Sequence, residues 1–154
     1  MCLLWYKADV PFKLADWKRL SARLELARIQ VAQHRREMAE GKAETQHLLD
    51  SAVMGIHPMA EYAVNVLLEL AGQDPERRHK TGDRARELKA LGRLRGDYGK
   101  VLDQLQNYWL AAHYLGYGRT PSTHYNASNI ETCLSAVDEL VTEVAAALRT
   151  LEKL

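Results

Sequence analysis

The chain has 154 residues, 47% of them hydrophobic, which fits one globular domain with a substantial core. Its 21 basic and 20 acidic residues nearly balance, so the whole molecule has no field that concentrates nucleic acid or anionic membrane around it. The two cysteines, Cys2 and Cys133, form no CxxC motif, which argues against a disulfide-stapled secreted domain. No apolar run approaches the roughly 20 residues of a membrane-spanning helix. We therefore expect a cytoplasmic protein without a membrane segment.

Residues 13–40 place apolar side chains at steps of three and four, which predicts one long helix. At 1.5 Å per residue this helix would span about 42 Å, more than a compact domain of this size needs. We therefore expect part of it to pack on a partner. Gly41 is a suitable residue to end it. The predicted buried stripe consists of Trp17, Leu20, Leu24, Ala27, Val31, His34 and Met38.

The same spacing resumes between Leu49 and Leu70, with Pro58 in the middle of the pattern. A proline inside a helix removes one backbone hydrogen bond and pushes on the preceding turn. We expect a kink or a break there, so that this region forms either one bent helix or two shorter ones. The apolar positions are Leu49, Ala52, Ile56, Met59, Ala63, Val66 and Leu70.

The second half of the chain predicts three further helices. Residues 73–99 are charged and offer only Leu88, Leu91 and Leu94 as a stripe, so we expect one short helix between loops. A stripe from Val101 to Leu115 predicts a helix that ends at Gly116. Ser128 and Glu131 have the spacing of a capping box for a last helix. Its predicted inner face is Ile130, Leu134, Val137, Val141, Val144, Leu148 and Leu151.

No strand pattern of useful length is present. Long apolar stripes on several helices are typical of an antiparallel bundle, because each stripe then faces its neighbours along its full length. The sequence predicts an all-α fold, an antiparallel helical bundle of four long helices plus one short helix, in a single domain over residues 1–154.

Metal and cofactor sites have weak support in the sequence. Glu44 and His47 form one Glu-x-x-His motif of the kind that binds iron in helical bundles, but a second copy is absent. His34, His47 and His57 would have to converge from two helices to hold Zn²⁺. No glycine-rich phosphate loop follows a strand. We expect no metal and no cofactor, and keep a metal-binding bundle that uses His34, Glu44, His47 and His57 as an alternative.

Residues 76–100 form a basic segment, with nine basic and four acidic side chains. Such a patch can bind phosphates without reading bases. The commoner origin is a solvated helix face with ion pairs between its own side chains. The candidate nucleic-acid-binding residues here are Arg84, Arg86, Arg93 and Arg95.

The stretch LQNYWLAAHYLGYG, residues 105–118, places His113 near the end of an apolar helix, with aromatic residues around it. The dipole at a helix C-terminus favours protonated imidazole, which would keep this histidine usable for proton transfer. The alternative is a buried histidine bonded to a neighbouring carbonyl. From the residues alone, the second interpretation is favoured.

Four segments in order resemble a HEPN domain, a helical-bundle family of prokaryotic toxin–antitoxin and other defence systems. They are MAEYAVNVLLELAG, RHKTGDRARELKALG, LAAHY and YNASNIETCLSAVDELVTEV. The resemblance covers residues 48–148 and leaves most of the helix at 13–40 outside. It implies a helical domain in which His113 corresponds to the family histidine.

In active members of that family, an arginine stands four to six residues before the histidine, and two such helices meet across a dimer to cut RNA. Imidazole moves a proton there, and guanidinium stabilises the phosphate charge. Here the corresponding positions hold Tyr108, Asn107 and Gln106. Some members carry a tyrosine two residues after the histidine, which a paired nucleotidyltransferase modifies. This chain has Leu115 at that position.

Two interpretations of function follow from the resemblance. The leading one is a non-catalytic HEPN-like domain that forms a homodimer and binds a partner protein, such as a nucleotidyltransferase, or a nucleotide or RNA ligand. The alternative is a metal-independent, toxin-like RNase in which His113 and Asn107 orient the RNA and Arg119 or Arg95 supplies the charge.

Overall fold

The computed structural model describes residues 12–42, 45–74, 80–113 and 124–154. Within these ranges the chain forms five helices and no strand, which confirms the all-α prediction of four longer helices and one short one. None of these helices combines the length and the apolar character needed to cross a membrane. Their bounds are α1 Leu14–Ala39, α2 Gln46–Leu70, α3 Thr81–Ala90, α4 Gly99–His113 and α5 Ala127–Thr150.

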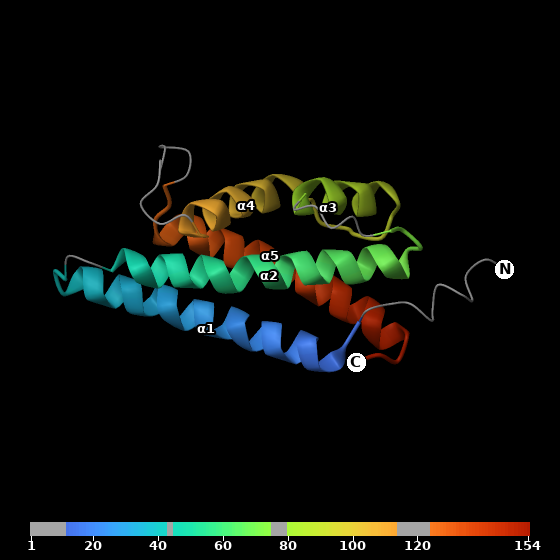
Figure 1. The fold of residues 1–154 in the computed structure, drawn as a ribbon, viewed down its shortest axis with the longest axis horizontal. Coiled ribbons are helices and arrows are strands. Elements are labelled where there is room, and N and C mark those ends of the chain that lie inside the picture. The colour runs from blue at the N-terminus through green and yellow to red at the C-terminus, as the bar shows by residue number, and fades with distance from the viewer. Residues whose placement is uncertain (1–11, 43–44, 75–79, 114–123) are drawn as a thin grey trace.

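Helix α2 is the centre of the bundle and contacts all four other helices. In Figure 1, α1 runs antiparallel to α2 on one side, α3 and α4 follow each other along the other side, and α5 crosses behind. The sequence explains this position, because 13 of the 25 residues of α2 are buried, against six of the 26 residues of α1. An element that is apolar nearly all round has to lie inside.

Close approach of α1 to α2 depends on Gly55. A Cβ atom at this position would lie 3.1 Å from the backbone oxygen of Arg23 in α1. That distance is too short for an unstrained contact, so a side chain here would push α1 outward. Glycine in a helix interior costs stability by itself, and the packing of the two longest helices offsets that cost.

Most of the predicted apolar stripes are buried, and the errors fall at helix ends. Met38, Leu91 and Leu151 were expected inside but are 56%, 49% and 44% exposed. Met38 is in the last turn of α1, while Leu91 and Leu151 are the C-cap residues of α3 and α5. At these points the helices extend past their neighbours, so the periodic pattern continues after the packing has stopped.

Of the kink or break expected at Pro58, the break does not occur. Helix α2 is continuous through this residue from Gln46 to Leu70. Proline removes one backbone hydrogen bond there, but the adjacent residues His57 and Met59 are buried. Packing of α2 against four helices outweighs the loss of a single bond.

The predicted cap of the last helix was also wrong by two residues. The N-cap of α5 is Asn126, and its side chain accepts a hydrogen bond from the Asn129 backbone N–H while the Asn129 side chain accepts from the Asn126 N–H, both at 2.9 Å. Ser128 and Glu131 bind Arg35 of α1 instead, at 3.2 Å and 2.8 Å from its Nη2 atom. Asparagine occupies both positions of this capping box, whereas the usual sequence pattern has Ser or Thr followed by Glu or Gln, so the pattern indicated Ser128 instead.

The connection between α3 and α4 is held by one carboxylate of α5. Glu143 accepts hydrogen bonds from the backbone N–H groups of Arg95 at 2.7 Å and Gly96 at 3.1 Å, and from the hydroxyl of Tyr98. Burial by itself raises the pKa of the Glu143 carboxyl, but these hydrogen bonds and the charge of Arg95 together lower it below its ordinary value. Burial and the bond to Glu143 raise the pKa of Tyr98.

We expect Glu143→Gln to lower the free energy of unfolding at neutral pH by about 1–3 kcal/mol, because two backbone N–H groups and the Tyr98 hydroxyl lose a charged acceptor. The folded-state pKa of Glu143 is depressed, so its contribution is present above the unfolded pKa and disappears as pH falls through the folded pKa. The difference between wild type and variant should therefore shrink in acid. Urea unfolding at neutral and acidic pH measures this.

Glu139→Gln is the matched control, because Glu139 is exposed one turn earlier on α5 and forms no hydrogen bond among the described residues. An equal loss of stability in both variants would show that general charge on α5, and not the Glu143 contacts, holds the connection.

Candidate functional site

His113 is the last residue of α4 and is exposed. Its ring stacks on Trp109, one turn earlier, with the ring centroids 5.6 Å apart and the planes 24° from parallel. This contact follows from the i, i+4 spacing on a helix. The structure therefore places the candidate histidine at the surface, with an aromatic support beneath it, and not in the core.

Trp109 is partly buried and continues the contact inward to α2. Its ring centroid lies 4.8 Å from that of His57, with the planes 30° apart. Three rings, His57, Trp109 and His113, thus form a continuous run from the core to the surface, which we call the ring stack. Sequence reasoning missed it, because His57 and Trp109 are brought together only by the packing of α2 against α4.

His57 is an unusual member of this stack. It is 2% exposed, and neither Nδ1 nor Nε2 has a hydrogen-bond partner. Nε2 lies 3.4 Å from a carboxylate oxygen of Glu61, which is close, but the geometry is not that of a hydrogen bond. A buried polar group without a partner costs free energy, so fold stability alone does not favour histidine here.

The outer face of α4, defined here by Asn107, Leu110 and His113, is exposed to solvent. Leu110 is 39% exposed and apolar, between two polar neighbours on the same side of the helix. Asn107 and His113 lie six residues apart, about 9 Å along the helix axis, so they are on the same exposed side but too far apart to bind the same ligand atom.

Helix α4 contains no arginine. Its one lysine, Lys100, is 13 residues from His113, about 20 Å along the axis, too far to act on the same phosphate. Arg119, the candidate substitute cation, lies outside the described residues, as do Tyr114, Leu115 and Tyr117.

Two of the four candidate RNA-binding arginines are engaged in ion pairs. Arg84 contacts Glu87 at 3.3 Å, and Arg86 contacts Asp83 at 2.9 Å and Asp103 of α4 at 2.5 Å. The hydrogen bond to Asp103 raises the pKa of Arg86 above its ordinary value. The Arg86–Asp103 pair joins α3 to α4, and all three pairs leave less free charge for a phosphate.

Arg93 and Arg95 follow α3 and are exposed. Arg93 forms no ion pair among the described residues, while the backbone N–H of Arg95 binds Glu143 and fixes the course of the chain. Of the four candidate arginines, Arg93 and Arg95 are the two whose side chains form no ion pair among the described residues.

The histidines expected for a metal site do not converge within the described residues, where no group of three or more histidine, cysteine or acidic side chains is placed to hold an ion. Nδ1 of His34 lies 3.1 Å from the Thr45 carbonyl oxygen, His57 packs on Trp109, and His47 is exposed. Glu44 lies outside the described residues.

Cys133 is buried, and burial raises the pKa of its thiol to about 12. The thiol is therefore protonated at neutral pH, which makes it a poor nucleophile and a poor metal ligand.

The family model described as HEPN domain matches residues 26–148, most of the chain. The chain belongs to the HEPN domain family. The match begins inside α1, whereas the sequence resemblance was assigned from residue 48. The second half of the long first helix is therefore part of the family region. No curated protein and no solved structure matches the chain.

The two buried histidines offer a matched test of whether the fold itself needs His57. We expect His57→Leu to leave the free energy of unfolding unchanged or to raise it, because it removes a buried polar ring whose nitrogens form no hydrogen bond. His34→Leu should lower it by about 1–3 kcal/mol, because the Thr45 carbonyl loses one of its two partners and keeps only the Leu48 N–H. Urea unfolding of both variants measures the difference. A larger loss in His57→Leu than in His34→Leu would show that His57 is structural.

Proposed function

We propose that this HEPN domain is non-catalytic and acts as a cytoplasmic binding module, as in a toxin–antitoxin or related defence pair. The observation that carries the proposal is the position of His113 at the exposed end of a helix that contains no arginine. Cleavage of RNA builds charge on the phosphate, and without a fixed cation the transition state loses several kcal/mol of electrostatic stabilisation. A histidine with aromatic support but no cation is suited to contact a ligand.

The outer face of α4 is the proposed contact between two copies of the chain. An exposed leucine at the centre of a face with a partly buried tryptophan beside it is typical of a contact surface, because aromatic and apolar anchors with a polar rim dominate such interfaces. Two copies related by a twofold axis would bring both His113 side chains to one groove.

The ligand of the dimer is proposed to be a nucleotide or RNA, or a partner protein that carries a nucleotide, such as a nucleotidyltransferase. Arg93 and Arg95 support this, because they are exposed while Arg84 and Arg86 are held in ion pairs. Binding through so few cations predicts a modest dependence on salt.

Leu110→Glu tests the dimer. We expect the wild-type chain to be a dimer at micromolar concentration and the variant to be a monomer, because two carboxylates would be buried at the centre of the contact. Light scattering after size exclusion measures the mass. Leu91→Glu is the matched control, since Leu91 is also an exposed leucine, at 49% against 39% for Leu110, but lies at the end of α3. A monomeric wild type would contradict the proposal.

An RNA-cleavage time course of the wild type and His113→Ala, after treatment with chelator, tests the absence of catalysis. We expect neither protein to cleave structured RNA above background, because no fixed cation accompanies His113 on α4. Cleavage by the wild type that disappears in His113→Ala would overturn the proposal and select the RNase, with Arg119 or Arg95 as the source of positive charge.

A further inference from the structure

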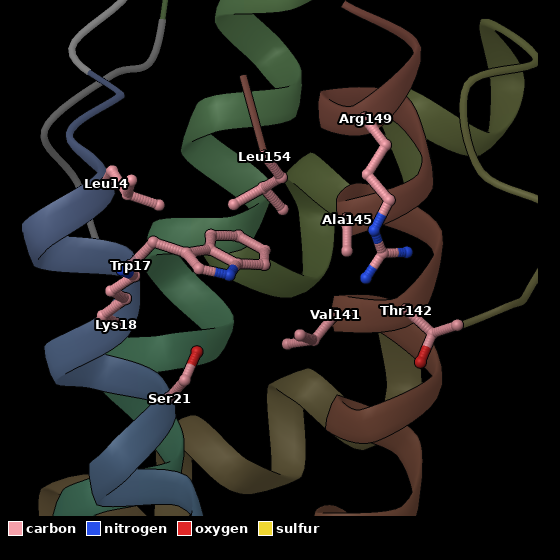
Figure 2. A pocket seen from close by; sticks show the side chains of 9 residues that line it. All are labelled: Leu14, Trp17, Lys18, Ser21, Val141, Thr142, Ala145, Arg149 and Leu154. Carbon is pink, nitrogen blue, oxygen red and sulfur yellow. The ribbon is translucent and has the colours of Figure 1, made fainter. Parts of the chain in front are cut away.

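A surface pocket lies between the first turns of α1 and the last turns of α5, at the end of the bundle opposite to the C-terminus of α4 (Figure 1). Its volume of about 580 Å³ is within the range of small-molecule sites. The start of α1 and the end of α5 lie at the same end of the bundle, so side chains from both helices line the pocket. Figure 2 shows the side chains that line it.

Trp17 forms the floor of this pocket and is held rigidly. It is 7% exposed, and its ring packs on Phe12 and Tyr62, with centroids 6.0 Å and 6.4 Å away. The Tyr62 hydroxyl accepts a hydrogen bond from the Lys13 backbone N–H at 2.9 Å, which anchors the aromatic cluster to the start of α1.

The indole N–H of Trp17 has no acceptor among the described residues. Figure 2 shows the indole reaching from α1 toward α5, with its nitrogen on the side of Val141 and Ala145. The ring is buried, but Nε1 is not among the fully buried side-chain atoms that lack a partner, so this N–H is accessible to solvent. An accessible donor on this ring can donate a hydrogen bond to a ligand oxygen in the pocket.

Two cations flank the same pocket, Lys18 from α1 and Arg149 from α5. Neither has a carboxylate within ion-pair distance among the described residues, and no acidic side chain lines the pocket. By contrast, Arg28 and Arg35 of α1 pair with Asp138 and Glu131 of α5. The α1–α5 seam therefore neutralises its charges along its length and leaves two positive charges unpaired at this end.

The backbone does not decide the charge preference of the pocket. The start of α1 is a positive helix end and the last turn of α5 a negative one, so the two dipoles oppose each other. Lys18 and Arg149 therefore set the sign. The Ser21 hydroxyl, which points into the pocket in Figure 2, adds a neutral hydrogen-bonding group.

We propose that this pocket binds a small organic anion, a carboxylate or phosphate carried on an apolar body. The anion accepts hydrogen bonds from Trp17 Nε1 and the Arg149 guanidinium, while the apolar body packs on Leu14, Val141 and Leu154. Leu14 and Leu154 are 43% and 39% exposed, so covering them contributes apolar burial. This site is separate from α4 and does not depend on the proposed dimer.

Calorimetric titration of the full chain with hexanoate, hexyl phosphate and hexanol tests the proposal. We expect at least one anion to bind about tenfold or more tightly than hexanol, because a charged hydrogen bond exceeds a neutral one by this order. The tighter anion identifies the head group as carboxylate or phosphate. Equal binding of hexanol, or no binding of either anion, would overturn the proposal.

Arg149→Gln should weaken the anion about tenfold and leave hexanol unchanged, and Trp17→Phe should weaken the anion by removing the N–H while keeping an aromatic ring in the floor. Arg36→Gln, which removes an exposed cation in the last turn of α1 and outside the pocket, is the control and should bind as wild type does. Thermal melting followed by circular dichroism checks that the variants are folded. Unchanged anion binding in Arg149→Gln would overturn the proposal.

Discussion

Burial of α2 is the constraint on which the rest of the structure depends. Each fully buried aliphatic side chain contributes about 1.5–3 kcal/mol relative to an exposed one, and α2 buries such residues on nearly every side. The other helices are placed by the side of α2 that they cover: α1 by the Gly55 approach, α4 by the contact of Trp109 with His57, and α5 by its crossing behind. Pro58 is tolerated for the same reason.

Polar side chains refine this apolar arrangement. The carboxylate of Glu143 holds the α3–α4 connection, and the Arg28 and Arg35 pairs align α1 with α5. These groups have partners and act as local clamps. His57 differs because its ring is buried without a hydrogen bond, and a feature that costs stability is a reasonable mark of function. The His57 ring packs on Trp109, and Trp109 stacks on the exposed His113, so the buried histidine is in indirect contact with the surface one.

The two proposed surfaces lie at opposite ends of the bundle and differ in chemistry. One is the outer face of α4, apolar at its centre with histidine at its tip; the other is a cationic pocket between α1 and α5 (Figure 1). A dimer formed through α4 would leave the pocket open in each copy. The extra length of α1, which begins before the family match, supplies one wall of that pocket.

The sequence by itself determined the helices, their order and most of the core, because the three-and-four spacing of apolar residues is a local property that packing then uses directly. Trp17, Leu49 and Val137 are buried as that spacing predicts. It also determined the family resemblance and the absence of an arginine before His113 on α4. Where the pattern ran past the end of a neighbouring helix, as at Met38 and Leu91, it failed.

Only the tertiary structure decided which side chains meet. His57 and Trp109 are 52 residues apart, and Trp17 and Arg149 are 132 apart, so no spacing rule connects either pair. Among the described residues, Arg84 and Arg86 are engaged by carboxylates while Lys18 and Arg149 are not. The net charge of a segment does not reveal this, because the availability of a charge depends on what packs beside it.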